Sequence, residues 1–215
     1  MQKSASRQFS MRRRFFGSKS LERQRILAEP YFGKEDLARA NGSSDAIRFR
    51  KLSESAERVC ALAGMGTPCV RMLYSSKKGQ DCQIGIPKDN GGTVIIYSAW
   101  LADRFGGDVH DAITSHEMIH FATGCGEKKA DARAVSLLGS AKGLLEFFEF
   151  KRAMYLGEEP GSFAHRCIVA VDTGEYGMLP KFPGAKIAAR LIHALATRSP
   201  PLINRIRALE KLKAG

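Results

Sequence analysis

The sequence predicts an α+β fold in which a small sheet backs a group of helices. Three short runs of apolar and β-branched residues, at residues 69–74, 83–86 and 93–97, indicate strands. Stretches with apolar residues at helical spacing precede and follow them, beginning with residues 45–63. A chain of 215 residues with 44% hydrophobic composition can bury one sizeable core. We therefore expect one domain with extensions.

The elements follow one another with clear boundaries in the first half of the chain. The helix at residues 45–63 stops at Gly64-Met65-Gly66, and Asn90-Gly91-Gly92 signals a hairpin before the third strand. Residues 98–105 and 109–122 have helical patterns. The strands should form a small antiparallel or mixed sheet.

The second half of the chain reads as helices joined by loops. A helix over residues 127–138 is expected to continue through Tyr155, and further helices are expected over residues 185–196 and 201–213. Pro and Gly mark the loops, and the stretch that contains His165 and Tyr176 reads as rich in loops.

A metal-binding motif lies in the helix at residues 109–122. His116 and His120 are four residues apart, so they project from one face of the helix and can bind one Zn²⁺. Glu117 between them can act on the water at the open position of the metal. This His-Glu-x-x-His pattern predicts a catalytic zinc site.

The next helix offers a third ligand. Gly124-Cys125-Gly126 breaks the first helix and permits a reversal, and Glu127 opens the second helix. Small alanines on this second helix allow a close approach, so Glu127 can reach the zinc while Asp131, one turn on, orients a histidine. An ordinary first-turn acid, favoured by the helix dipole, is the alternative interpretation of Glu127.

These motifs resemble a known enzyme family. His-Glu-x-x-His followed by Glu-x-x-Ala-Asp-x-x-Ala is similar to the pattern of gluzincin metallopeptidases, in particular the HtpX-like and CAAX prenyl protease family and its soluble minigluzincin relatives. Residues 197–206 resemble that family's closing Thr-His-Pro-Pro-Leu-x-x-Arg-Ile segment, with Arg198-Ser199 in place of the histidine. The resemblance spans roughly residues 47–213.

The resemblance implies a zincin-like fold and a soluble zinc endopeptidase that hydrolyses protein or peptide substrates. His116, His120 and Glu127 would hold the zinc, and Glu117 would be the general base. Only six residues separate His120 from Glu127, which is short for the family, so Asp131 is the alternative third ligand.

Two further roles are open at the sequence level. An oxyanion donor is expected among His165, Tyr155, Tyr176 and Arg205, with His165 and Tyr176 preferred as catalytic residues. By the resemblance, one edge strand of the sheet would pair with an extended substrate. Residues 93–97 are the candidate for that edge, and a purely internal strand is the alternative.

The first 44 residues differ in composition from the remainder, so we expect a basic N-terminal extension at 1–44 and a metallopeptidase domain at 45–215. Residues 1–21 carry six Lys or Arg and no acid, half of the net charge of +12. Such a segment is typical of a disordered tail, a mitochondrial targeting sequence, or an arm that contacts nucleic acid or an anionic membrane surface. The basicity is therefore weak evidence for nucleic-acid binding by the domain.

The cysteines and the hydropathy of the chain limit the cellular compartments that we expect for the protein. The five cysteines are irregularly spaced and odd in number, which favours free thiols in a reducing compartment, and we expect a cytoplasmic protein, with mitochondria as the alternative. No apolar run is long enough to span a membrane. The sequence does not predict an oligomeric state.

Two other classes of function compete with an active peptidase. One is a latent or regulatory zinc-binding protein, and the other is a nucleic-acid-associated protein with structural zinc. A structural site is normally closed by four protein ligands, so Cys125 or His110 would have to complete it.

Overall fold

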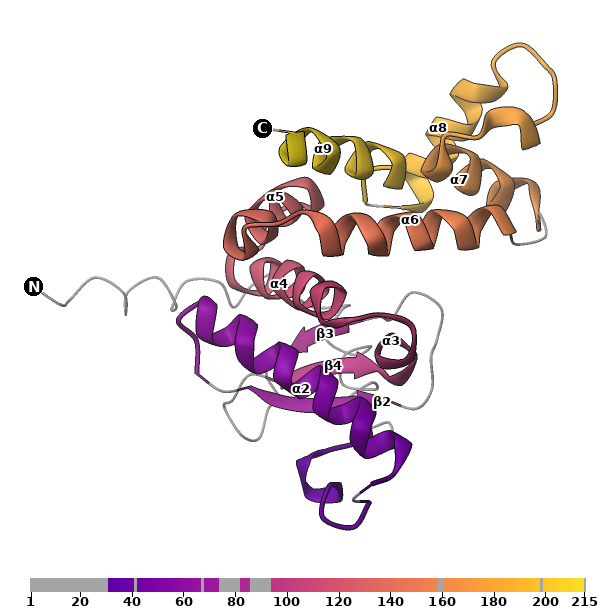
Figure 1. The fold of residues 1–215 in the computed structure, drawn as a ribbon. Coiled ribbons are helices and arrows are strands. Elements are labelled where there is room, and N and C mark those ends of the chain that lie inside the picture. Colours follow the sequence, from indigo (N-terminus) through magenta and orange to yellow (C-terminus); the bar gives the residue numbers. More distant parts are fainter. Residues whose placement is uncertain are drawn as a thin grey trace, which may run out of the picture.

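The computed structural model describes residues 31–40, 42–66, 68–73, 82–85, 94–157, 161–197 and 199–214. These residues form a mostly helical α+β fold (Figure 1). The strands are β1 (Tyr31–Phe32), β2 (Cys69–Leu73), β3 (Cys82–Gly85) and β4 (Val94–Ser98). The helices are α2 (Ser44–Leu62), α3 (Ala99–Arg104), α4 (Gly107–Thr123), α5 (Glu127–Leu138), α6 (Lys142–Gly157), α7 (Phe163–Thr173), α8 (Ala185–Ala196) and α9 (Leu202–Ala214), with short 3-10 turns η1 (Lys34–Asp36) and η2 (Tyr176–Met178).

The sheet is mixed, with strand order β1-β2-β4-β3. β2 pairs with β4 in parallel, whereas β1 and β3 are antiparallel to their neighbours. β4 therefore lies inside the sheet, and the prediction that residues 93–97 form the edge beside the cleft was wrong. Among the described strands, β3 is the edge on that side. The hairpin signal at residues 90–92 falls outside the described residues.

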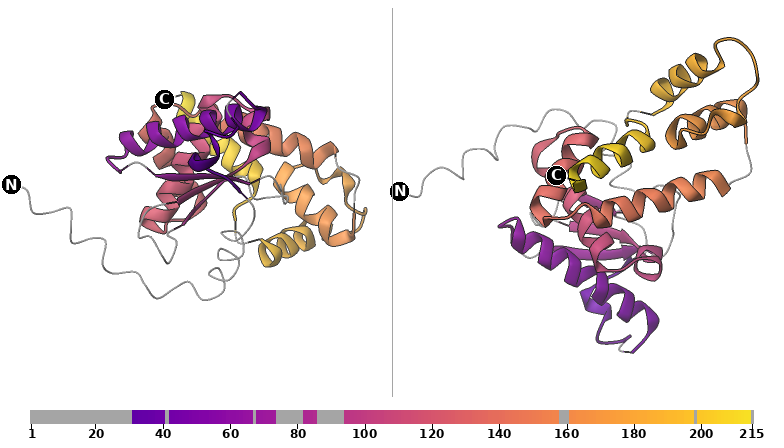
Figure 2. Two further views of the ribbon diagram at one scale, coloured as in Figure 1. Left: turned by 90° about the horizontal axis from the view of Figure 1, so that it is seen from below. Right: turned by 45° about the horizontal axis from the view of Figure 1, so that its top comes forward.

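The core lies between one face of the sheet and the helices. Ile95 and Tyr97 of β4 are fully buried and point to the same face, because alternate residues of a strand share a face. They belong to the main apolar core with Leu52 of α2 and Val109 of α4. Figure 1 shows α4 between the sheet and α6, and the right-hand view of Figure 2 shows the same order. The helix that carries the metal-binding motif is thus the central element of the fold.

Helix α4 is held to its neighbours by polar contacts as well as by the core. The hydroxyl groups of Tyr97 and Thr114 form a buried hydrogen bond between β4 and α4. His110 Nε2 bonds to the carbonyl oxygen of Leu101 at 2.9 Å, which ties α4 to α3. These contacts fix the rotation of α4 about its axis and therefore the direction in which His116 and His120 point.

Residues within the predicted N-terminal extension contribute to the described fold. β1 pairs Tyr31 with Leu73 and Phe32 with Met72. Phe32 is buried, and its ring centroid lies 5.5 Å from that of Phe49 in α2. The packed part of the chain thus begins by Tyr31, ahead of the boundary expected at residue 45.

The C-terminal half corrects two further expectations. Gly139, with φ of 68°, ends α5, so the predicted continuous helix to Tyr155 is two helices, α5 and α6. The stretch predicted to be rich in loops contains helix α7, which packs on α8 around a small separate core. That core is formed by Cys167, Ala170, Val171, Leu179, Ala185 and Ala189. In the described part of the chain, no helix has the length and apolar character needed to cross a membrane.

Candidate metal centre

A tight turn between α4 and α5 brings the predicted ligands together. Gly124 ends α4 in the left-handed conformation at φ of 61°, which is accessible to glycine without strain. α5 then folds back onto α4, with Ala130 and Ala134 fully buried at the contact. Because these side chains are small, the two helices approach closely enough for Glu127 to face the histidines of α4.

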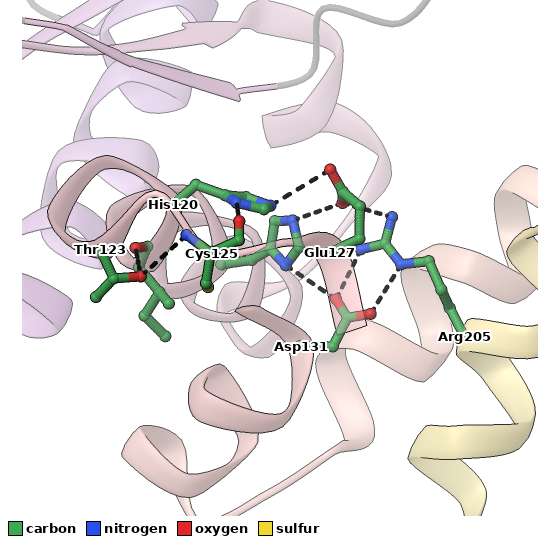
Figure 3. A network of polar contacts seen from close by, with 8 residues as sticks. His120, Thr123, Cys125, Glu127, Asp131 and Arg205 are labelled. Carbon is green, nitrogen blue, oxygen red and sulfur yellow. Dashed lines mark hydrogen bonds and ion pairs between the residues drawn. The ribbon is translucent and has the colours of Figure 1, made fainter. Parts of the chain in front are cut away.

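His116, His120 and Glu127 form a cluster with the geometry of a metal site. One ligand atom from each residue lies within 4.8 Å of the others. Glu127 Oε2 lies 3.2 Å from His116 Nε2, and Glu127 Oε1 lies 3.4 Å from His120 Nε2 (Figure 3). The two imidazole rings meet edge to face with centroids 4.5 Å apart. Two imidazoles and a carboxylate therefore converge on one point.

The outer nitrogens of both histidines are held by the protein. His120 Nδ1 donates to the carbonyl oxygen of Cys125 at 2.8 Å, and His116 Nδ1 lies 2.9 Å from Asp131 Oδ1. These contacts favour the tautomer in which the Nε2 lone pair is free for a metal. Nε2 of His120 is buried and makes no hydrogen bond of good geometry among the described residues. A buried imidazole nitrogen without a hydrogen bond fits the role of a metal ligand.

Asp131 and Arg205 form a second layer behind the ligands. Arg205 of α9 donates to both carboxylate oxygens of Asp131, from Nε at 2.8 Å and from Nη2 at 2.6 Å. Its Nη1 lies 2.9 Å from Glu127 Oε2 (Figure 3). Asp131 is buried, faces His116 and is not a member of the ligand cluster. The structure therefore places Glu127, and not the alternative Asp131, beside both histidines.

The electrostatics of the cluster follow from these contacts. Burial alone would lower the pKa of His116, but Asp131 and Glu127 outweigh it and raise that pKa to about 9. The two imidazoles hold the pKa of Glu127 well below its usual range. Burial would raise the pKa of Asp131, but its contacts with His116 and Arg205 reverse the effect and lower it. Both acids are therefore anionic at neutral pH and able to balance a cation.

Glu117 lies on the same helix in a different environment. It is half-buried, and burial raises the pKa of its carboxyl group despite the opposing attraction of His116 and His120. A carboxylate with a raised pKa is a better proton acceptor than an exposed one. Its position between the histidines and its raised pKa suit a general base.

The other predicted site residues lie elsewhere. His165 is in the first turn of α7, where its Nδ1 accepts a hydrogen bond from the Gly161 amide at 3.2 Å. Tyr176 opens η2, packs against the α7–α8 core and has Lys186 Nζ 5.4 Å from its ring centroid. Neither belongs to the cluster on α4 and α5, and their role as oxyanion donors stays a prediction.

Arg205 and Tyr155 were the other candidates for that role. Arg205 instead binds the two acids of α5, and sequence reasoning missed this function. Tyr155 lines a cavity of about 230 Å³, together with Asp172, His193 and Arg205 itself.

A closed structural site would need a fourth protein ligand. His110 is directed to the Leu101 carbonyl group, and Cys125 contributes its backbone carbonyl oxygen to His120. Neither side chain joins the cluster, which within the described part of the chain consists of three residues. A four-coordinate metal held by these three residues alone would keep one position for water or substrate, which is the arrangement of catalytic and not of structural zinc sites.

Comparison with known proteins adds no relative. Neither a protein-family model, nor a curated protein, nor a solved structure matches this chain.

Proposed function

We propose that the protein is a zinc-dependent endopeptidase. The observation that carries the proposal is the convergence of His116, His120 and Glu127, with Glu117 on the same helix as the two histidines. Two neutral imidazoles and one carboxylate are a donor set that suits Zn²⁺, and three protein ligands are typical of catalytic zinc. Asp131 and the Cys125 carbonyl oxygen supply the contacts that orient ligand histidines in such sites.

The residues around the cluster suit hydrolysis of an amide bond. When bound, the zinc supplies Lewis acidity and lowers the pKa of water to about 7. Glu117 accepts the proton of the attacking water and then delivers it to the leaving nitrogen of the peptide. Burial raises the pKa of the Glu117 carboxyl group, which makes it a stronger proton acceptor than an exposed glutamate.

The position of β3 supports an extended peptide as the substrate. Among the described strands, β3 is the edge of the sheet next to β4, and it packs beside α4. A peptide added to this edge would form main-chain hydrogen bonds that do not depend on its side chains. Such a peptide would run past the helix that carries Glu117 and the histidines. We therefore propose a protein or peptide substrate that is held mainly through its main chain.

The test combines metal analysis with cleavage of a casein-type substrate. Glu117→Gln should keep one bound zinc per chain and lose peptidase activity, because both histidines and Glu127 remain while the base is removed. Glu146→Gln, on an exposed position of α6, is the matched control and should behave as the wild type. Glu127→Ala should lose zinc as well as activity. Equal turnover by Glu117→Gln and wild type would refute the proposed mechanism.

Zinc without cleavage of any protein substrate would favour the latent or regulatory alternative. A protein that binds no metal would give a different result, and it would contradict both the peptidase and the latent or regulatory alternative.

A further inference from the structure

Helix α8 presents large aliphatic side chains to solvent. Ile187, Leu191 and Leu195 lie at i, i+4 and i+8, so they form one stripe along the helix. They are 64%, 60% and 88% exposed. We call these three residues the α8 stripe. A single exposed leucine is common on protein surfaces, whereas contiguous exposed apolar side chains are a feature of interaction sites.

The stripe is separate from the surface by which α8 joins the fold. Ala185, Ala189 and His193 are buried on the side that faces α7. His193 Nε2 pairs with Asp172 of α7 at 3.0 Å, which fixes the rotation of α8. The His193–Asp172 pair and the small apolar core on the opposite side of α8 therefore keep the stripe exposed to solvent. Figures 1 and 2 show α8 at the end of the molecule away from the sheet.

The surroundings of the stripe are basic. Lys186 and Arg190 are exposed on α8, each directly before a residue of the stripe, and exposed Lys181 and Phe182 precede the helix. From Tyr176 to Leu209 the sequence contains no Asp or Glu. This stretch combines bulky apolar groups with positive charge and has no compensating acid of its own. A partner that matches this surface therefore has both an apolar region and negative charge.

We infer that the α8 stripe docks on the surface of an anionic lipid bilayer. An apolar helical stripe flanked by Lys and Arg is the pattern of helices that lie in the membrane interface, with leucines below the headgroups and bases at the phosphates. A second copy of the chain is a poor fit, because a symmetric contact would bring together two basic α8 surfaces, and residues 176–209 contain no Asp or Glu to balance them. The protruding position of α8 leaves it free to approach a flat surface (Figure 2).

The docking surface is distinct from the metal cluster on α4 and α5, so it does not depend on the proposed peptidase activity. It would bring the protein to a membrane reversibly, since a single short helix gives a weak anchor. The inference can be tested whether or not the protein cleaves peptides.

Binding of the full-length protein to vesicles is the first measurement. Vesicles of phosphatidylcholine with about 30% phosphatidylserine are compared with phosphatidylcholine alone, at about 0.1 M salt. Leu191→Gln with Leu195→Gln should weaken binding to the acidic vesicles by about tenfold or more. Lys186→Glu with Arg190→Glu should weaken it too, and the wild-type binding should fall at high salt.

Two matched double variants control for the loss of exposed apolar groups and of positive charge at positions outside α8. Ile47→Gln with Leu62→Gln removes two exposed aliphatic groups from α2, and Lys211→Glu with Lys213→Glu reverses two charges on α9. Both should bind as the wild type does. All of these substitutions are at exposed positions, so the melting temperature reports whether each variant is folded.

Contact with the acyl chains separates α8 docking from simple attraction of the basic N-terminal residues. Leu195→Trp should be quenched by brominated lipid in acidic vesicles, whereas Leu62→Trp should not be. No quenching at position 195, or equal binding by the wild type and the Leu191/Leu195 double variant, would overturn the inference. It would also be overturned by a dimer that this double variant abolishes, because a second copy would then cover the stripe.

Discussion

Arg205 and Asp131 form a two-pronged ion pair, with Nε–Oδ2 and Nη2–Oδ1 distances of 2.8 and 2.6 Å. The same guanidinium group lies 2.9 Å from Glu127 Oε2 and stacks 4.2 Å from the ring centroid of Phe148. The last helix of the chain thus fixes both acids of α5 beside the histidines of α4. A planar guanidinium group is suited to this task, because its donors match a carboxylate in direction.

We expect Arg205→Lys to weaken zinc binding by about 10- to 100-fold. Lysine keeps the charge but cannot pair with both oxygens of Asp131, so Asp131 would hold His116 less firmly. Competition with a chromophoric chelator measures the affinity. Arg207→Lys, at an exposed position of the same helix, is the control and should not change it. If Arg205→Lys binds zinc as tightly as the wild type, Arg205 serves to dock α9 and not to orient the ligands.

Zinc affinity should rise with pH up to about 9. In the metal-free protein His116 carries a proton below that pH, because its pKa is raised to about 9. The metal needs the lone pair of Nε2, so binding displaces this proton and the apparent affinity falls as pH falls. The expected slope is up to about tenfold per pH unit between roughly 6.5 and 8.5.

Calorimetry in buffers of different ionisation enthalpy counts the protons that are released on zinc binding. Asp131→Asn removes one of the carboxylates that raise the pKa of His116, so the slope should become shallower in this variant. A pH-independent affinity in the wild type would show that His116 is already neutral in the metal-free protein.

The parts of the site that the sequence predicted are those with local signals. His116 and His120 share a face because of helix geometry alone, and the glycines after them require a turn wherever the helix lies. Ala130 and Ala134 indicated close packing of the next helix, and both are buried at that contact. Local periodicity thus allowed the prediction that Glu127 can reach the histidines, although it left an ordinary first-turn acid as the alternative.

The features that sequence reasoning missed depend on contacts distant in the chain. Strand order is set by pairing between segments, so no pattern within residues 93–97 shows that β4 lies between β2 and β3. Helix α7 contains Ile168, Val169 and Val171, whose β-branched side chains favour strands, and packing on α8 overrides that preference. Arg205 and Asp131 are 74 positions apart in the sequence, and no local pattern around either residue predicts that they form an ion pair.

Packing of α6 against α4 should not tolerate a methyl group at Gly143. A Cβ there would lie 2.1 Å from the carbonyl oxygen of Asp108 and 2.8 Å from Ala112 Cβ. Alanine is the better helix former by about 1 kcal/mol, but the clash is with backbone and no rotamer relieves it. We expect Gly143→Ala to lower the free energy of unfolding by about 1–3 kcal/mol.

Thermal and denaturant unfolding measure this loss. Gly157→Ala is the matched control, because a Cβ at Gly157 would have no neighbour within 4 Å, and its stability should be unchanged or slightly higher. Wild-type stability of Gly143→Ala would mean that the two helices are packed less closely than the structure shows.

Truncation of the N-terminus should separate the basic segment from the folded part of the chain. Removal of residues 1–30 should leave zinc affinity and melting temperature near the full-length values, since their charge bias and lack of apolar periodicity suggest little contribution to the core. Removal of residues 1–44 also deletes β1 and the buried Phe32, which should cost about 3–5 kcal/mol and lower the melting temperature by about 10 °C. Phe32→Ala in the full chain should reproduce most of that loss. If the longer truncation is as stable as the shorter one, β1 does not stabilise the sheet.

The activity of the variant that lacks residues 1–30 tests the role of this segment. A large gain of peptidase activity would identify residues 1–30 as an inhibitory segment, and unchanged activity with altered location would identify them as a targeting signal.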